Sequence, residues 1–293
     1  SLPGLLGTNA FFNKSFRHKI ERYGDMEQAQ ILSQRIAPFV LRRTKDEVVG
    51  ELPPKTEISQ SLELEKDQRN LYESIRLVME KKLRDLFATQ GVGSSHIEFL
   101  DALLKLRQAC CDPRLVKLEQ AQKVKSNAKL DWLKQNLPEM VQEGRKILIF
   151  SQFTSMLSLI EAELVDLGLE YSKLTGQTRL RQAQIDKFQE GDTPVFLISL
   201  KAGGTGLNLT AADTVIHYDP WWNPAAEKQA TDRAHRIGQD KPVFVYKLIA
   251  EGTVEEKIQE MQQHKQSLAD SILEGKGKGT WQGSADELLS LFS

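Results

Sequence analysis

Residues 195–208 decide the fold, and they read VFLISLKAGGTGLN. The first four of these residues form a continuous apolar run, which is typical of a parallel strand buried on both faces. Three glycines follow within residues 203–206. Open α/β sheets bind ligands at the carboxyl ends of their strands, where such a loop lies. The segment therefore predicts one strand of a parallel sheet followed by a binding loop.

Strands and helices alternate around this segment, from about residue 126 onwards. Apolar runs predict further strands at 147–150, ending at Leu174, at 215–218 and at 243–248. Apolar residues at helical spacing predict helices that carry Leu130, Leu133, Leu137, Leu157, Ile160, Leu164, Leu167, Ile185 and Phe188, and a further helix from about Ala225. This alternation with short loops predicts a doubly wound α/β fold with a mainly parallel sheet.

Helical patterns flank the alternating region on both sides. Residues 66–90 and a second stretch that ends before Pro113 predict a helical insertion, interrupted at 91–95 by glycine and serine. At the other end, Thr253 and Glu256 have the spacing of a capping box, which predicts a helix start. That helix should end near Gly275, before a flexible Gly-Lys linker and a short docking helix at 285–292.

Composition indicates an ordinary folded protein. Of 293 residues, 40% are hydrophobic and 27% are charged, and 39 Lys and Arg nearly balance 40 Asp and Glu. Any nucleic-acid binding must then come from a local patch. Cys110 and Cys111 are adjacent, so we expect free, half-buried helix residues and neither a disulfide nor a zinc site. No apolar run is long enough for a bilayer. The chain starts at Ser1, and we expect it to belong to a longer protein.

The glycine loop is the first segment that could carry chemistry. Glycines let the backbone approach a ligand closely, and Thr205 and Asn208 add short polar groups. A phosphate of a nucleotide or of a nucleic-acid backbone would suit the loop. The alternative is a tight turn that requires positive φ.

The second such segment is residues 229–239. At 100° per residue, Gln229, Arg233 and Arg236 fall on one face of a continuous helix. Guanidinium groups suit the charge that develops on a transferring phosphoryl group. The alternative is a solvated face with surface ion pairs, for which Asp232 is a candidate partner.

Two further segments remain. Residues 219–224 place Trp221 and Trp222 between prolines in a turn, where a ring could stack on a base or fill the boundary between strand and helix. We expect one ring to be buried and one to be available. Residues 38–45 form a basic cluster, for which a solvated turn is the simpler reading. His217 and His235 lack metal-ligand spacing, and we interpret them as structural.

Two nucleotide-binding motifs are missing from the sequence. No Gly-x-x-x-x-Gly-Lys-[Ser/Thr] loop occurs, and no acidic strand-end motif of the Asp-Glu-x-His kind is present to hold magnesium. These motifs hold the phosphates and the metal in ATP-hydrolysing enzymes. Arginines without a phosphate loop indicate half of a composite site.

Together these segments resemble the second RecA-like lobe of Swi/Snf-type ATPases, the translocating branch of the superfamily-two helicases. The motifs that carry the resemblance are residues 147–153, 174–176, 199–208, 219–224 and 229–239, with 38–55 and 106–110 as flanking segments. The resemblance implies a RecA-like sheet with a helical insertion and a C-terminal brace helix. It covers nearly the whole chain and is weakest in the last 18 or so residues.

The resemblance also implies roles for individual residues. Arg233 and Arg236 would act catalytically by reaching the ATP phosphates across a cleft. Gly204, Gly206 and Gln229 would lie at the nucleotide. The implied DNA contacts are Gln152, Thr175, Lys201, Thr205, Asn208 and Trp222. No metal ligand is expected in this chain, because ATP and Mg²⁺ would be held mainly by the absent first lobe.

The sequence is thereby divided into four parts: the end of a first lobe with its connecting segment (1–55), a helical protrusion (56–125), the RecA-like lobe (126–252), and a brace helix with tail (253–293). We expect half of an ATP-driven double-stranded-DNA translocase, inactive as an ATPase alone. Its partners would be duplex DNA, the first lobe of the same protein and a protein–DNA complex, with no membrane. It would act in a bacterial cytoplasm, or in a nucleus if eukaryotic. A non-catalytic DNA- or protein-binding module and a strand-separating helicase remain as alternatives.

Overall fold

The computed structural model describes residues 8–19, 25, 28, 30–32, 52–202, 207–221, 223–264 and 285–292. The chain divides into two compact units, Ser1–Glu51 and Leu52–Ser293. In the first unit, α1 (Asn9–Phe12) continues into the π-helical turn η1 (Asn13–Arg17), where the buried ring of Phe16 packs against other phenylalanines. The basic cluster at 38–45 lies outside the described residues.

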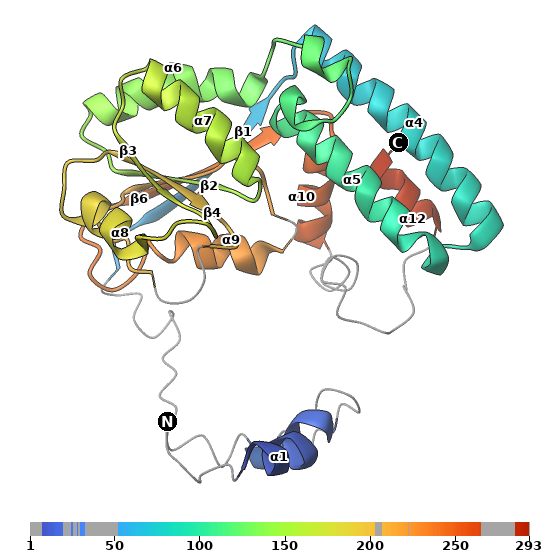
Figure 1. Ribbon diagram of the computed structural model, residues 1–293, viewed down its shortest axis with the longest axis horizontal. Coiled ribbons are helices and arrows are strands. Elements are labelled where there is room, and N and C mark those ends of the chain that lie inside the picture. Colours follow the sequence, from blue (N-terminus) through green and yellow to red (C-terminus); the bar gives the residue numbers. More distant parts are fainter. Residues whose placement is uncertain are drawn as a thin grey trace. The chain divides into compact units, whose positions relative to one another are not determined.

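The second unit is built on one six-stranded sheet in which every pairing is parallel (Figure 1). Its strands are β1 (Lys55–Leu62), β2 (Ile147–Ser151), β3 (Tyr171–Leu174), β4 (Val195–Ser199), β5 (Thr214–His217) and β6 (Val243–Ala250). Across the sheet they follow the order β1-β6-β5-β2-β4-β3. The predicted doubly wound, parallel α/β class is confirmed.

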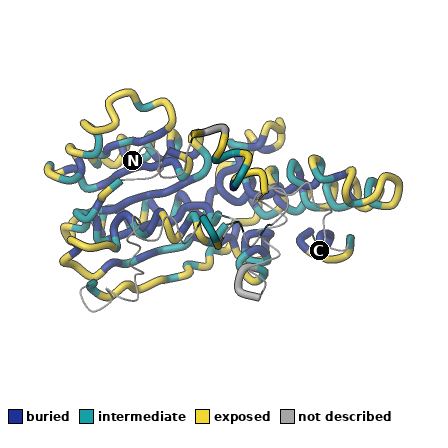
Figure 2. The backbone as a smooth tube through the Cα atoms, turned by 90° about the horizontal axis from the view of Figure 1, so that it is seen from below, coloured by how far each residue is buried: buried dark blue, intermediate teal, exposed yellow. Residues whose placement is uncertain are grey.

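Helices cover both faces of the sheet. One face packs against α6 (Ala128–Gln142) and α7 (Thr154–Asp166), and the other packs against α8 (Arg181–Gln189) and α9 (Pro224–Thr231). In β2, Ile147 and Ile149 belong to the first core cluster, and Leu148 and Phe150 belong to the second. Alternate side chains of a strand point to opposite faces, so a strand apolar throughout its length serves both cores. Figure 2 shows the burial along these strands.

A third core cluster holds the helical insertion together. It joins the antiparallel pair α4 (Lys66–Gln90) and α5 (His96–Cys111) to α10 (Val254–His264), to α12 (Ala285–Leu289) and to the turn η8 (Ser290–Phe292). Short 3-10 turns connect the elements at η5 (Gly93–Ser95), η6 (Pro113–Leu115) and η7 (Ala121–Lys123). The ring of Phe292 lies 5.8 Å from that of Phe99. The predicted short docking helix is therefore present and buried against the insertion.

The helix that starts at Val254 confirms the predicted helix start, although its hydrogen bonds differ by one residue from those of a capping box. Thr253 Oγ1 accepts from Glu255 N at 3.2 Å, and Glu256 Oε2 accepts from Gly252 N at 2.8 Å. The first bond satisfies an amide that the first helical turn leaves open, and the second ties the residue before the cap to the helix. The remainder of the predicted helix and the Gly-Lys linker, residues 265–284, lie outside the described residues.

Three expectations need correction. The sequence pattern indicated no strand at Lys55–Leu62, yet β1 pairs with β6 along its whole length at the edge of the sheet. The helix that was predicted to carry Gln229, Arg233 and Arg236 stops at Thr231. Cys110 and Cys111 are fully buried rather than half-buried, and both are free thiols. In the part of the chain that is described, no helix is long and apolar enough to cross a membrane.

Candidate functional site

The carboxyl edge of the sheet brings together three of the predicted DNA contacts and the carboxylate of Asp219. Parallel strands end at the same edge, so the residues that follow them lie together. Gln152 follows β2, Thr175 follows β3, Lys201 follows β4 and Asp219 follows β5. Lys201 is exposed, Gln152 is half-buried, and the other two are buried. The edge thus carries polar groups contributed by four parallel strands.

The glycine loop is anchored at both of its described ends. Gly204, Thr205 and Gly206 lie outside the described residues, as does Gly203. Before the gap, Ala202 N donates to Ser199 O at 3.0 Å, and Ala202 O accepts from Arg181 Nη2 at 2.7 Å. After it, Leu209 N donates to Arg233 O at 3.0 Å, and Asn208 is exposed. The exit of the loop is therefore tied directly to the arginine segment.

The two arginines lie at different depths beside this loop. Arg233 is buried, with 6% of its surface exposed, whereas Arg236 is exposed and donates from Nη1 to Leu207 O at 3.4 Å. Burial lowers the pKa of Arg233, and the nearby charge of Arg236 lowers it further. Two like charges that repel each other next to a glycine loop are suited to an anion with several oxygens.

The predicted geometry of this segment is wrong, because one continuous helix does not carry all three side chains. Gln229 lies in α9, but Arg233 and Arg236 follow its end. After Thr231 the amides of Arg233 and Ala234 bond three residues back rather than four. The carbonyl of Arg233 accepts from Leu209 N instead of continuing the helical ladder. A tertiary hydrogen bond thus competes with helix propagation at this point.

Gln229 is exposed on α9 and lines a separate hollow. That hollow, of about 420 Å³, is bordered by Asn223, Ala225, Ala226, Lys228, Gln229 and Asp232. Gln229 lies on α9, one turn before the arginines. A contact between Gln229 and a nucleotide stays a prediction.

The tryptophan turn starts from a buried carboxylate. Asp219 is 1% exposed, and burial raises its pKa to about 6, with Arg107 opposing the shift. Trp221 is half-buried and donates from its backbone N to Glu227 Oε1 at 2.6 Å. Trp222 lies outside the described residues, so the predicted division between one buried and one available ring stays a prediction.

Thr175 and the two histidines make hydrogen bonds within the described part of the chain. Thr175 Oγ1 accepts from Gln177 N at 3.2 Å, which builds the turn after β3. His217 Nε2 lies 3.0 Å from Thr231 Oγ1 and its ring stacks on Phe150, and His235 Nε2 lies 2.8 Å from Pro53 O. These contacts agree with the structural interpretation of the histidines. Nowhere in the described ranges do three or more His, Cys, Asp or Glu side chains form a possible metal site.

Sequence reasoning missed two buried cations. Arg107 on α5 is 3% exposed and reaches the Gln152 side chain, although it lies within the quoted segment 106–110. Lys129 at the start of α6 is fully buried and pairs with Glu255 at the start of α10. In the sequence, each of these two cations appears as a charged residue within an apolar helical stripe. That pattern does not show whether the charge is buried unless the position of its partner is known.

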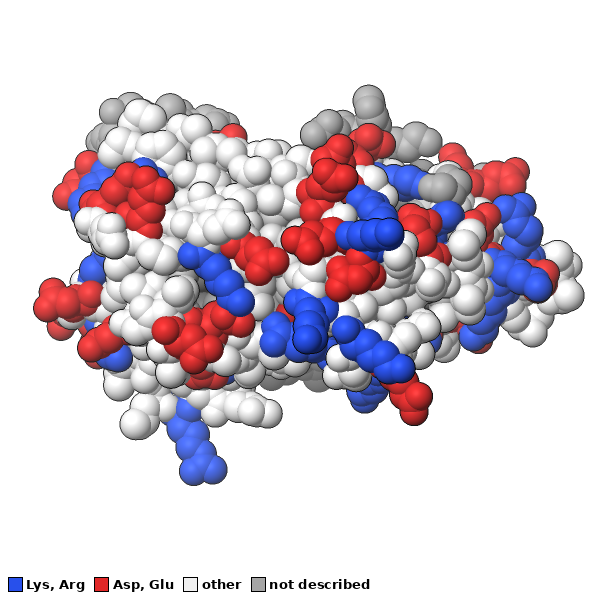
Figure 3. Space-filling view, turned by 90° about the horizontal axis from the view of Figure 1, so that it is seen from above, with Lys and Arg blue, Asp and Glu red and all other residues white. Residues whose placement is uncertain are grey.

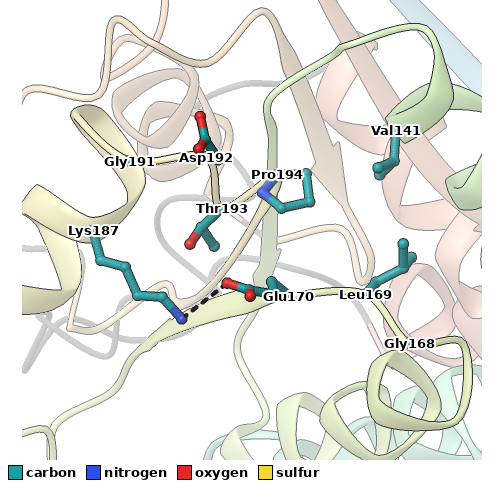
Figure 4. Close-up of a pocket in the computed structure, with 9 residues that line it drawn as sticks. All are labelled: Val141, Gly168, Leu169, Glu170, Lys187, Gly191, Asp192, Thr193 and Pro194. Atoms are coloured by element: carbon teal, nitrogen blue, oxygen red, sulfur yellow. Dashed lines mark ion pairs between the residues drawn. The ribbon is translucent and has the colours of Figure 1, made fainter.

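A hollow at the opposite edge of the sheet is unconnected with these residues (Figure 4). It measures about 530 Å³ and lies among the turns that precede β3 and β4. An exposed ion pair, Lys187 Nζ to Glu170 Oε2 at 3.6 Å, lies at its rim. Over the face drawn in Figure 3, charges of both signs are interspersed, in line with the balanced composition.

Two protein-family models match the chain. The SNF2-related domain matches residues 2–115, and the helicase conserved C-terminal domain matches residues 128–238. The second match includes the glycine loop, the tryptophan turn and both arginines.

Curated relatives match almost the whole chain. A putative ATP-dependent helicase/translocase of Bacillus subtilis is 39% identical over 99% of this chain and 32% of its own length. An uncharacterized ATP-dependent helicase of Mycoplasma pneumoniae is 38% identical over 99% of this chain and 27% of its own. A mouse SWI/SNF-related regulator of chromatin is 38% identical over 94% of this chain and 27% of its own. The chain thus spans about a third or less of these relatives.

Solved structures agree with the sequence matches. The Sulfolobus solfataricus SWI2/SNF2 ATPase core in complex with double-stranded DNA matches with a TM-score of 0.66 and 34% identity, over 99% of this chain and 61% of that one. The C-terminal domain of the Sulfolobus ATPase matches with a TM-score of 0.63 and 32% identity, over 81% of this chain and 97% of that one. The sheet and its flanking helices are therefore those of a RecA-like C-terminal lobe.

Proposed function

Because this chain belongs to the SWI2/SNF2 family of ATP-dependent helicases, we propose that it supplies the second half of a motor that translocates on double-stranded DNA. In this proposal, Arg233 and Arg236 reach the phosphates of ATP bound mainly by another lobe. The carboxyl edge of the sheet grips the DNA backbone.

One observation carries the proposal. The exit of the glycine loop is bonded to the arginine segment at two points, Leu209 N to Arg233 O and Arg236 Nη1 to Leu207 O. A movement of the arginines would therefore be transmitted to a loop at the edge where Gln152 and Lys201 also lie. Coupling of this kind is what a motor needs to convert nucleotide state into a changed grip.

The chemistry of the donors supports phosphates as the ligand. Guanidinium groups donate in a planar fork that matches phosphate oxygens, and they bind no metal ion. Magnesium bound with ATP would be held by ligands outside this chain, and it would neutralise part of the phosphate charge. Gly204, Gly206 and Gln229 are proposed to border the nucleotide. Gln152, Thr175, Lys201, Thr205, Asn208 and Trp222 are proposed DNA contacts. Grip on phosphates makes movement largely independent of base sequence.

The division of labour follows from the same proposal. Residues 126–252 together with the strand β1 would form the moving lobe, the rest of 56–125 a protrusion and 253–293 a brace, with 1–55 leading from the first lobe. The strand β1 places Lys55–Leu62 in the sheet of the lobe, so the chain enters the lobe before it forms the protrusion. An isolated chain would not turn over ATP, because it lacks the phosphate loop.

The test uses the two-lobed parent protein, with DNA-stimulated ATP hydrolysis and DNA affinity measured separately. Arg236→Ala should lower hydrolysis by about 10³-fold while DNA affinity stays normal. Arg84→Ala is the control, because Arg84 is an exposed guanidinium in α4 that pairs with Glu80 one helical turn away. Normal turnover in Arg236→Ala would refute the arginine role and favour a non-catalytic binding module.

A further inference from the structure

Arg107 occupies an unusual position for an arginine in the helical insertion. It belongs to α5, yet its side chain leaves the helical core and lies, 3% exposed, against the carboxyl edge of the sheet. A buried guanidinium is costly unless hydrogen bonds and opposite charge compensate it. Its partners therefore explain why it is there.

The two arms of the guanidinium hold two different loops. Nη1 donates to Gln152 Oε1 at 2.9 Å, after β2, and Nη2 donates to Pro220 O at 2.9 Å, after β5. Asp219 lies 3.8 Å from Nη2 and also accepts from the backbone N of Gln152 at 3.2 Å. The guanidinium carbon lies 5.8 Å from the ring centre of Phe153 and 6.0 Å from that of Trp221. One side chain thus sets the spacing between two loops.

This contact also determines the orientation of the Gln152 amide. A guanidinium only donates, so the amide oxygen must face Arg107 and the amide nitrogen must point elsewhere. That nitrogen is buried and has no hydrogen-bond partner within the described part of the chain. The amide therefore carries an unused donor beside the turn that Arg107 also holds, and a phosphate oxygen could satisfy it once the groups that cover it move aside.

We propose that Arg107 is a positioning residue for the DNA-contact edge: it orients the Gln152 amide and holds the Asp219–Trp221 turn against α5, so that the helical pair α4–α5 and these loops respond to DNA as one unit. This inference rests on the proposed function of the edge. Lysine could not replace arginine in this role, because a single ammonium group cannot reproduce a rigid fork aimed at two loops.

The experiment measures ATP hydrolysis of the two-lobed protein at increasing concentrations of a DNA duplex. Arg107→Lys should raise the half-saturating DNA concentration about tenfold, the size expected for loss of one charge-assisted hydrogen bond. The DNA-free rate and the KM for ATP should stay unchanged. The matched control is Arg69→Lys on α4, since Arg69 makes a similar fork to Gly252 O at 3.0 Å and Glu251 O at 2.6 Å, after β6, where no DNA contact is proposed.

A second variant separates positioning from folding. Gln152→Glu keeps an acceptor for Arg107 but removes the amide donor, so it should fold normally and show the same loss of DNA response. Combining it with Arg107→Lys should add little, because both changes break one pathway.

Three results would overturn the inference: a normal DNA response in folded Arg107→Lys or in Gln152→Glu, an equal defect in Arg69→Lys, or a parallel fall in the DNA-free rate. In each of these three results, DNA would still stimulate ATP hydrolysis by the unmodified protein. Failure of the proposed function would instead appear as no DNA stimulation in the unmodified two-lobed protein.

Discussion

Lys129 Nζ lies 2.7 Å from Glu255 Oε2 and 2.9 Å from Oε1, and neither side chain is accessible to solvent. The ammonium group also donates to Tyr218 O at 3.0 Å, and Glu255 Oε2 accepts from Ala250 N at 3.0 Å. This pair therefore joins the start of α6, the start of α10 and the ends of two central strands. It is the point at which the proposed brace is attached to the lobe.

Removing one partner of this pair should be strongly destabilising. Lys129→Met leaves the Glu255 carboxylate buried without its counter-charge, so we expect a loss of about 3–5 kcal/mol in the free energy of unfolding. Urea denaturation of the chain measures it. Lys134→Met on the same helix is the control, because Lys134 pairs with Glu163 near the surface and should contribute less than about 1 kcal/mol. Equal losses in the two variants would contradict the prediction.

Stability should depend on pH through Asp219. Burial raises its pKa from the ordinary 3.8 to about 6, so the native state binds this proton more tightly than the unfolded state does. The free energy of unfolding should then fall as pH rises from about 4 to 6, by about 3 kcal/mol from this group. Asp219→Asn should flatten the slope in that window. Denaturation curves at several pH values test this, and parallel profiles for the two proteins would contradict it.

Gly191 should resist replacement for a steric reason. A Cβ at this position would lie 2.5 Å from the carbonyl oxygen of Lys187, in the last turn of α8. We expect Gly191→Ala to lower the free energy of unfolding by about 1–3 kcal/mol. In Gly93→Ala the new methyl group meets open space, so this control should be neutral or stabilising by up to about 1 kcal/mol. Thermal melts of both variants decide the matter.

DNA affinity should fall with salt, and Lys201 should contribute to that dependence. Lys201 is exposed at the carboxyl edge, directly after β4. If it contacts a phosphate, Lys201→Ala should weaken binding to all duplexes similarly and reduce the slope of log K against log salt by about 1. Lys187→Ala, at the opposite edge of the sheet, should leave the slope unchanged. An unchanged slope in the Lys201 variant would remove this residue from the proposed contacts.

The sequence pattern predicted strands correctly where both faces of the strand are buried. The strands β2 and β4 are apolar except for a final serine and are buried on both faces, so their continuous apolar sequence indicates this environment directly. The strand β1 escaped detection because its side chains alternate between exposed and half-buried at an edge, and because two prolines precede it. Its position depends on pairing with β6, which lies about 190 residues away in the chain.

Long-range contacts also explain what was mispredicted in the candidate site. The periodicity of residues 229–239 fits a helix, but after Thr231 the backbone bonds become shorter in range and the Arg233 carbonyl accepts from Leu209 N. The placement of Arg107 beside Gln152 could not be inferred, because it needs the insertion and the sheet to be docked. The residue types at the edge were predictable, whereas their mutual arrangement was not.

The pairing of β1 with β6 has a mechanical consequence. The two strands run parallel, with Lys55 opposite Val243 and Leu62 opposite Ala250. A pull that enters the lobe before Lys55 and leaves it after Ala250 acts along the strands in shear, so it loads the hydrogen bonds between them together rather than one after another. We therefore expect this edge to withstand tension along its length far better than peeling from one end, which forced unfolding in the two pulling directions would reveal.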